Sequence, residues 1–261
     1  MNLQKFIKSI LFLATFFLFI SPSSAQENDS IADKIEPAAV NTNSIDIFDS
    51  ATATKYKKVD QFILRMKKRN KKAAILGKEI AAPFTSDEEK VRALFIWETN
   101  NISYDCVAYH QKHATKGNFS YKNQEELIAK LDKYYANIAA LTLRNKKGVC
   151  EGYAILFREL CKANGIKCQL VDGRASENKD KIRKLRNRKS FSTNHMWNKV
   201  EINGAWYYID VTWAAGYCDK SVKKFYKKFN SSYFLVPLDN LYATHAENAK
   251  LTERRNNPMT E

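Results

Sequence analysis

The chain has 261 residues, of which 44% are apolar and 12% aromatic, and its formal net charge is +15. This composition supplies enough apolar side chains for a packed core and excludes a wholly disordered chain, and the length fits one sizeable domain or two small ones. The excess of basic residues indicates either anionic partners or a solvated basic surface.

The N-terminal segment has the pattern of a secretory signal peptide. Lys5 and Lys8 precede an apolar run of eleven residues, ILFLATFFLFI, and the small residues Ser23 and Ala25 follow it. The run is shorter than the roughly 20 residues that span a bilayer, so the pattern predicts cleavage after Ala25 rather than an uncleaved anchor. We therefore expect an exported protein, periplasmic or secreted, with no stable membrane anchor after cleavage of residues 1–25.

The remainder of the chain divides into three parts by composition. Residues 26–54 are polar and lack sustained periodicity, which predicts a flexible leader. A folded domain is expected over residues 55–250, and a polar tail follows at residues 251–261. The domain opens with a basic stretch from Tyr56, which fits a short amphipathic helix.

Two further helices are predicted upstream of residue 150. The stretch TSDEEKVRALFIWETN has Ser86 and Glu89 at the spacing of a capping box. Its helical stripe consists of Val91, Leu94, Phe95 and Glu98. The stretch NQEELIAKLDKYYANIAALTLRN, residues 123–145, is a second helical candidate that leads toward the cysteine at position 150.

A helix is also predicted immediately after Cys150, from Glu151 to about Ala163, with Gly165 as its C-terminal stop. Its apolar stripe consists of Ala154, Phe157, Leu160 and Cys161. The helix therefore starts at one cysteine and buries another.

A strand and a basic loop follow this helix. The stretch IKCQLVDGRA, residues 166–175, is interpreted as a strand, and residues 176–194 as a loop. Seven of the eleven residues at positions 179–189 are Lys or Arg.

The segment NHMWNKVEINGAWYYIDVTW contains the strongest hairpin signal. Asn203-Gly204 favours a two-residue type I′ turn, which pairs Ile202 with Ala205 and fixes the register. One face of the hairpin is then apolar and should be buried: Met196, Val200, Ile202, Ala205, Tyr207, Ile209 and Val211. The other face carries His195, Trp197, Lys199, Glu201, Trp206, Tyr208, Asp210 and Thr212. Asp210 and His195 are diagonal neighbours on that face, with backbones about 7–8 Å apart.

Cys150, His195 and Asp210 form a candidate catalytic group. An imidazole oriented by a carboxylate is the base half of a nucleophilic triad. Cys150 stands at a predicted helix N-terminus, where backbone N–H groups and the helix dipole favour a thiolate. Each residue also has an ordinary alternative: a structural cysteine, a polar strand histidine and a turn-forming aspartate. The hairpin register and the chain order Cys, His, Asp together favour the catalytic interpretation.

These segments resemble the transglutaminase-like superfamily, and within it the kyphoscoliosis-peptidase-like bacterial branch. The resemblance is carried by GVCEGYAILFRELCKANGIKCQLVDG and NHMWNKVEINGAWYYIDVTW, with support from ALFIWETNNISYD and SYFLVPLDNLYATH. It covers roughly residues 85–245 and implies a papain-like α+β fold, in which the nucleophile helix packs on an antiparallel sheet. It also implies a catalytic triad of Cys150, His195 and Asp210. The polar ending AENAKLTERRNNPMTE departs from the apolar ending that such chains often have.

The functional hypothesis is an exported thiol enzyme that transfers acyl groups through a thioester at Cys150. Peptide or amide hydrolysis, as in a cysteine peptidase, is slightly favoured over protein crosslinking because water is always present. The backbone N–H of Cys150 is the expected oxyanion donor, and Tyr104 is a guess for the second. The alternative is a non-catalytic binding module that holds a cell-envelope component on the same fold.

Composition also constrains the partners. Loss of Lys5 and Lys8 with the signal peptide lowers the net charge from +15 to +13. An exported basic chain is expected to meet protein or peptide substrates and anionic cell-surface polymers or acidic proteins rather than nucleic acid.

The remaining cysteines leave the disulfide pattern open. If Cys150 is a nucleophile, the other four could form up to two disulfides or none; they are Cys106, Cys161, Cys168 and Cys218. The sequence has no C-x-x-C pair, His110 and His113 lack neighbouring cysteines, and no calcium loop is recognisable. We therefore expect no metal and no cofactor.

Overall fold

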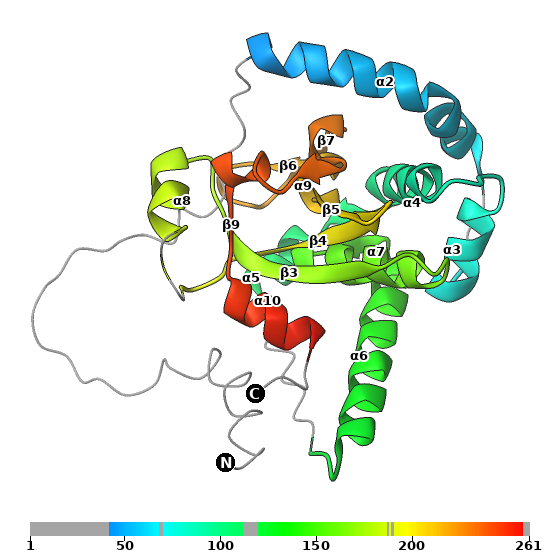
Figure 1. Ribbon diagram of the computed structural model, residues 1–261, viewed down its shortest axis with the longest axis vertical. Helices are drawn as coiled ribbons and strands as arrows, with labels where there is room; N and C mark the ends of the chain where they lie inside the picture. Colours follow the sequence, from blue (N-terminus) through cyan, green and yellow to red (C-terminus); the bar gives the residue numbers. More distant parts are fainter. Residues whose placement is uncertain (1–41, 68–69, 112–119, 187, 189–190, 258–261) are drawn as a thin grey trace, which may run out of the picture.

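A computed structural model describes residues 42–67, 70–111, 120–186, 188 and 191–257 (Figure 1). The signal peptide predicted for residues 1–25, and the leader as far as residue 41, lie outside the described residues. Within the described part of the chain, no helix combines the length and the apolarity that crossing a bilayer requires.

The architecture is α+β, as expected. The helices are α2 Thr42–Arg65, α3 Ala73–Ala81, α4 Asp87–Asn101, α5 Cys106–His110, α6 Gln124–Asn145, α7 Cys150–Lys162, α8 Lys179–Leu185, α9 Val211–Ala215 and α10 Ala249–Asn256, with 3-10 turns η2 Ser231–Tyr233 and η3 Leu241–Ala243. The strands are β1 Ser103–Tyr104, β2 Lys147–Gly148, β3 Cys168–Ala175, β4 His195–Ile202, β5 Ala205–Ile209, β6 Gly216–Cys218, β7 Phe225–Lys227, β8 Val236–Pro237 and β9 His245–Glu247.

The central sheet has the strand order β8-β5-β4-β3-β9, and every neighbouring pair in it is antiparallel. Helix α7 packs against β3 and β4, and α3, α4 and α6 pack in turn against α7 (Figure 1). The expected arrangement, with the helix that begins at Cys150 lying on an antiparallel sheet, is confirmed.

The β4–β5 hairpin has the predicted register. Asn203 and Gly204 have φ values of 52° and 79°, the left-handed region that a type I′ turn requires at both positions. Pairing runs from Ile202 opposite Ala205 to Asn198 opposite Ile209. The apolar face packs on α7 in the main core, although Ala205 at the tip is exposed.

The prediction that this strand continues through Thr212 is wrong. After Ile209 the chain turns into the short helix α9. The cause is Asp210, whose Oδ1 accepts a hydrogen bond from the Trp213 backbone N–H at 3.0 Å and so caps the helix.

The second face of the sheet is also covered. Trp197 and Tyr208 are buried in a smaller cluster with Val171, Val236 and Leu241. Apolar side chains thus enclose the sheet from both sides next to His195.

Asn198 fastens the sheet to α7 from within the core. It is fully buried, and its Nδ2 donates to the Ala154 carbonyl oxygen at 2.9 Å. A buried N–H donor is costly unless it is hydrogen-bonded, so the Nδ2 contact ties β4 to α7, whereas Oδ1 of the same amide has no hydrogen-bond partner among the described residues.

The helices upstream form largely as predicted. Ser86 accepts from the Glu89 backbone N–H at 3.3 Å and caps α4, and α6 matches the expected span to one residue. The short helix expected from Tyr56 instead begins at Thr42, inside the segment interpreted as a leader. This longer α2 docks through buried Arg92 of α4, which donates to both carboxylate oxygens of Asp60 at 2.8 and 2.7 Å.

The basic segment interpreted as a loop contains a helix, and this part of the prediction is wrong. Helix α8 is capped by Asn178, whose Oδ1 accepts from the Lys181 backbone N–H at 3.1 Å. Ile182 is fully buried and anchors the turn, while its basic neighbours stay in solvent. A single apolar anchor among many charges gives no periodic signal in sequence.

Within the polar C-terminal segment, residues 249–256 form α10, which covers the edge of β3 (Figure 1). Asn256 accepts from the Leu170 backbone N–H at 3.0 Å and donates to its carbonyl at 2.7 Å. Thr252 accepts from the Asp172 backbone N–H at 3.1 Å. The tail expected from residue 251 therefore begins inside a helix whose polar side chains satisfy backbone groups that β9 leaves unpaired.

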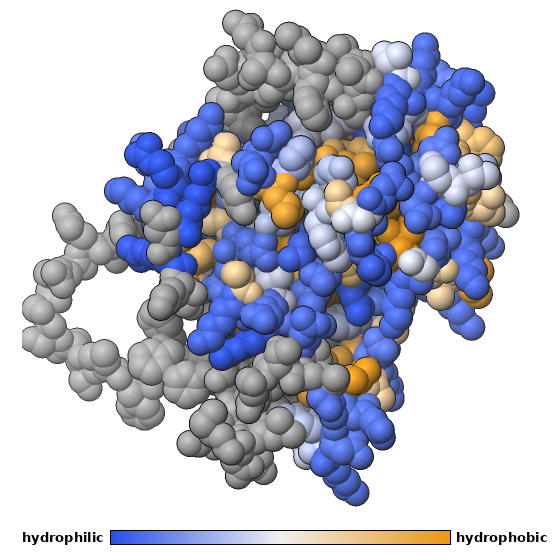
Figure 2. Space-filling view, in the orientation of Figure 1, coloured by the Kyte–Doolittle hydropathy of each residue, from blue (hydrophilic) through white to orange (hydrophobic). Residues whose placement is uncertain are grey.

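The visible surface is mostly hydrophilic, with apolar side chains in small separate spots (Figure 2). This agrees with the basic and polar composition of the chain.

One buried acid stands out in the core. Glu98 is fully buried, and neither of its carboxyl oxygens has a hydrogen-bond partner among the described residues. Burial, with a smaller contribution from nearby Cys168, holds the pKa of Glu98 well above its usual range. The side chain is therefore neutral in the native protein at a pH where it would ionise in the unfolded chain.

We predict that Glu98→Gln stabilises the protein increasingly as pH rises. The native state keeps a proton that the unfolded chain releases above the ordinary Glu pKa, so wild-type stability falls through that window by up to about 1.4 kcal/mol per pH unit. The amide cannot ionise and escapes this loss. Urea unfolding of both proteins at mildly acidic and mildly alkaline pH measures the difference. The exposed Glu125→Gln serves as control, and a pH-independent gap between wild type and Glu98→Gln would contradict the prediction.

Candidate active site

Cys150 is the first residue of α7, which is where the sequence places it. The strand β2 just before it pairs with β1, and an added Cβ at Gly152 would lie 2.9 Å from Thr142 Oγ1. The glycine thus lets α6 pack against the first turn of α7. The thiol is half-buried at a helix start, where the first backbone N–H groups have no intrahelical acceptor.

His195 and Asp210 meet on the adjoining sheet. His195 Nε2 lies 2.6 Å from Asp210 Oδ2, and the two residues are 9% and 0% exposed. His195 begins β4, and Asp210 follows β5 at the cap of α9. The structure therefore brings together the two residues that the hairpin register made diagonal neighbours.

The pair is ionised, and the two charges stabilise each other. Burial alone would lower the pKa of His195, but the charge and hydrogen bond of Asp210, aided by Cys150, raise it to about 10. Burial would raise the pKa of Asp210, but His195 and then His245 hold it well below its usual range. An imidazolium facing a carboxylate is the state expected at neutral pH.

Cys150 completes the group. Its thiol lies near enough to His195 to help raise the pKa of that imidazole. Because Nε2 of the ring faces Asp210, the other ring nitrogen, Nδ1, is the one left for the thiol. The three residues that the sequence singled out therefore lie close together, with a contact between His195 and Asp210 and with Cys150 nearby.

Tyr104, the guess for a second oxyanion donor, lies near Cys150. Burial raises the pKa of Tyr104 well above its usual range, and the nearby Cys150 raises it further. The hydroxyl therefore stays protonated and remains a donor.

The residue that sequence reasoning missed is His245. Its Nε2 lies 3.0 Å from the same Asp210 Oδ2, and its Nδ1 lies 2.8 Å from Thr244 Oγ1. Burial lowers the pKa of His245, so the ring is neutral. Nε2 must then carry the proton given to the carboxylate, and Nδ1 accepts from the Thr244 hydroxyl. His245 lies on β9, 35 residues after Asp210 in the sequence, so no pattern of neighbouring residues could predict this contact.

Aromatic side chains enclose the two imidazoles. Trp197 stacks on His195 with ring centroids 5.8 Å apart, and Trp213 lies 4.7 Å from His245. An added Cβ at Gly173 would be 2.3 Å from Trp197 Cη2 and also 2.3 Å from the Ala246 carbonyl oxygen. The missing side chain at Gly173 thus lets the indole lie against β3, and the enclosure strengthens the charged hydrogen bonds within it.

His195, Asp210 and His245 are also the described group that could be considered for a metal ion. With bonds of about 2.0–2.2 Å, tetrahedral zinc ligands stand roughly 3.3 Å apart. Here the carboxylate oxygen is only 2.6 and 3.0 Å from the two nitrogens. These distances fit hydrogen bonds better than a shared metal.

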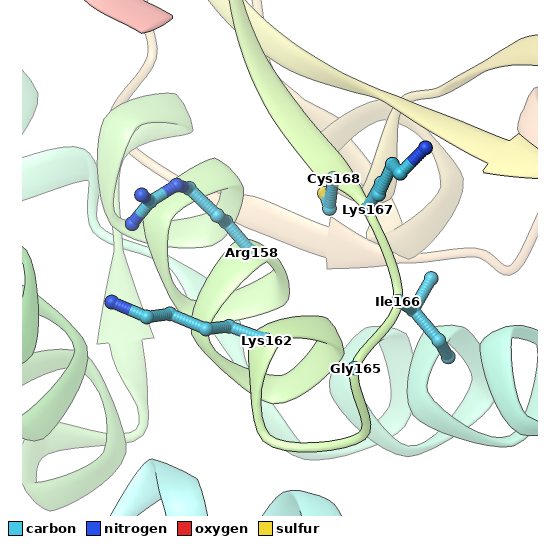
Figure 3. A pocket seen from close by; sticks show the side chains of 6 residues that line it. All are labelled: Arg158, Lys162, Gly165, Ile166, Lys167 and Cys168. Atoms are coloured by element: carbon cyan, nitrogen blue, oxygen red, sulfur yellow. The ribbon is translucent and has the colours of Figure 1, made fainter.

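A hollow of about 350 Å³ lies elsewhere, at the opposite end of α7 (Figure 3). It is lined by Arg158, Lys162, Gly165, Ile166, Lys167 and Cys168. Its cations are paired with carboxylates of the chain, for example Lys162 with Asp132 at 2.9 Å and Lys167 with Glu201 at 2.6 Å. The hollow includes none of the Cys150, His195 and Asp210 group, so it is separate from the candidate active site.

The family model of the transglutaminase-like superfamily matches residues 75–211, which include the hairpin and the helix that starts at Cys150. The chain belongs to the transglutaminase-like superfamily. The chain is 32% identical to kyphoscoliosis peptidase of Mus musculus, and also 32% identical to kyphoscoliosis peptidase of Homo sapiens. Each match extends over 153 residues, which is 58% of this transglutaminase-like chain. The expected resemblance to kyphoscoliosis peptidase is thereby confirmed.

The similarity has a limited extent. The matched region makes up 19% of each kyphoscoliosis peptidase. Among solved structures, a candidate cysteine protease from Cytophaga hutchinsonii is similar at 18% identity and a TM-score of 0.37, covering 82% of this chain and 50% of the other. This structural likeness is too distant to add to the family assignment.

We predict that His245→Ala destabilises the protein by about 1.5–3 kcal/mol, the usual contribution of a hydrogen bond to a charged group. Removal of the imidazole leaves Asp210 with one donor fewer in a buried setting. Urea unfolding at neutral pH measures the loss. His245→Gln keeps an N–H donor of similar reach and should recover part of it. Equal stability of wild type and His245→Ala would refute the assigned contact.

Proposed function

We propose that this transglutaminase-like chain is an exported thiol enzyme that transfers acyl groups through a thioester at Cys150, with hydrolysis of peptide or amide bonds favoured over protein crosslinking. The observation that carries the proposal is the 2.6 Å contact between His195 and Asp210, which leaves the other ring nitrogen to Cys150 at the start of α7. Family membership and similarity to kyphoscoliosis peptidase support a cysteine-peptidase or transglutaminase type of activity.

The acylation step follows from the ion pair. The Cys150 thiolate attacks the substrate carbonyl carbon, a C–S bond forms, and the carbonyl electron pair moves to oxygen. The His195 imidazolium then gives its Nδ1 proton to the leaving amine as the C–N bond breaks. The Asp210 carboxylate keeps its hydrogen bond to Nε2 throughout, so the ring stays in one orientation.

Deacylation reverses the roles. Neutral His195 takes a proton from water at Nδ1, the oxygen attacks the thioester carbon, and the C–S bond breaks to restore the thiolate. An amine in place of water would yield a crosslinked product. We favour water because it is always present and no amine-binding feature is evident in the sequence.

Two donors are available for the oxyanion. The Cys150 backbone N–H lies at a helix start and has no intrahelical acceptor, so it is free to donate. The neutral Tyr104 hydroxyl is the second candidate. Each such donor contributes up to a few kcal/mol to transition-state stabilisation.

Export is the second part of the proposal, and it rests on the pattern of residues 1–25. N-terminal sequencing of the protein from its native host tests it. A mature chain that starts at Gln26 is the expected result, and a retained Lys5–Lys8 segment would contradict export by this route.

Reactivity of the thiol gives a test that needs no substrate. We predict that iodoacetamide near neutral pH modifies Cys150 before the other cysteines, because an unactivated thiol is only a few per cent thiolate there. Asp210→Asn should slow this modification by roughly 10- to 50-fold. Asparagine keeps an oxygen to cap α9, so the fold should persist. Peptide mapping by mass spectrometry measures the rate at each cysteine.

A double variant provides the control for this test, because the effects of changing His195 and Asp210 should not add. His195→Ala and the double variant with Asp210→Asn should slow Cys150 modification by similar factors, because the pair acts as one unit. Half-buried Cys168 is the internal reference and should keep its rate in every variant. Unchanged rates at Cys150 would favour the alternative, a non-catalytic binding module.

A casein assay then separates the two reactions. New amino termini in casein would report hydrolysis, and incorporation of a biotinylated primary amine would report acyl transfer to amines. Both products should disappear in Cys150→Ala.

A further inference from the structure

Two cysteines outside the proposed triad face each other beside the active site. Cys106 begins α5 and Cys218 ends β6, and their Sγ atoms are 3.8 Å apart. The two residues are only 8% and 4% exposed. Both are thiols in this structure.

We propose that Cys106 and Cys218 are a disulfide site, and that this bond locks one wall of the active site. A disulfide has an S–S length of about 2.05 Å. The sulfur atoms are already in van der Waals contact, so closure needs a shift of less than about 2 Å, within the range of side-chain rotation.

Other contacts hold the two segments together without the bond. His110 Nε2 of α5 lies 3.1 Å from the carbonyl oxygens of Ser221 and Val222, in the turn after β6. The Tyr104 ring lies 6.5 Å from that of Phe225 on β7. The segments are therefore preorganised, and the bond would not have to draw them together.

The other cysteines have different neighbours. Cys150 lies near His195, and Cys161 lies near Cys168 at the far end of α7. Among the five cysteines, Cys106 and Cys218 are therefore the pair placed to form a disulfide with each other.

The bond would act on the site through its neighbours in the chain. Tyr104 lies two residues before Cys106, and its electrostatic neighbours include Cys150, Cys218 and Cys106. On the other side, β6 directly follows α9, which Asp210 caps. A covalent link here fixes the segment that presents the Tyr104 hydroxyl relative to the segment that starts at Asp210.

The chemistry balances by thiol–disulfide exchange with a small-molecule disulfide such as glutathione disulfide. One thiolate attacks the oxidant and releases one reduced thiol, and the second thiolate then attacks the mixed disulfide and releases the other. The protein loses two electrons and two protons, and the oxidant becomes two thiols. Burial raises the pKa of both cysteines, so the exchange is slow near neutral pH and faster in mild alkali.

The test uses the full chain, reduced or incubated with glutathione disulfide at mildly alkaline pH, then digested without reductant. Mass spectrometry should find the peptides of Cys106 and Cys218 linked in the oxidised sample alone. The bond closes a loop of more than a hundred residues, so the melting temperature should rise by roughly 5–15 °C. The Cys106→Ala/Cys218→Ala variant should lose this rise, and the matched Cys168→Ala variant should keep it.

Three results would overturn the inference: both thiols remaining free after oxidation, either one linked to a different cysteine, or an unchanged melting temperature in the linked protein. The readouts are linkage and stability, so they do not depend on catalysis. Failure of the proposed function would instead appear as unchanged Cys150 alkylation in Asp210→Asn.

Discussion

The architecture of the site depends on one buried carboxylate. Asp210 is 0% exposed and accepts hydrogen bonds from His195, His245 and the Trp213 backbone N–H. Its ionised state is tolerable inside the protein because these donors and the imidazolium charge replace water. The same residue ends β5, starts α9 and orients the imidazole next to Cys150, so a local turn and the proposed chemistry share a single side chain.

The candidate site forms where the helical layer meets the sheet. Cys150 belongs to a helix packed among α3, α4 and α6, whereas the histidines belong to strands. The Asn198 contact to the Ala154 carbonyl sets the position of one layer on the other. Sites carried by regular elements are held more accurately than sites on loops, which suits a proton transfer that requires hydrogen-bond distances.

The sequence predicted correctly those elements that are determined by a few adjacent residues. The Asn203-Gly204 turn fixed which residues face each other, and the start of α7 placed the thiol, because both depend on a few adjacent residues. His245 could not be found in this way, since it reaches Asp210 only through the pairing of β9 with β3. Helix α8 and the order of α10 were missed for a related reason: each depends on tertiary contacts, with one buried apolar residue or polar side chains on a strand edge. The family resemblance supplied the fold where local patterns were silent.

The close approach at Gly173 has an evolutionary consequence. Its absent side chain and the Trp197 indole occupy the same space, so neither position can be exchanged alone without loss of the enclosure around the histidines. An added Cβ at position 173 would also lie 2.3 Å from the Ala246 carbonyl oxygen of β9, so loss of the indole alone does not open the position to a larger residue. Position 173 is thus constrained from two sides, and members of the family that keep the β3–β9 pairing should keep glycine there even where the indole is replaced.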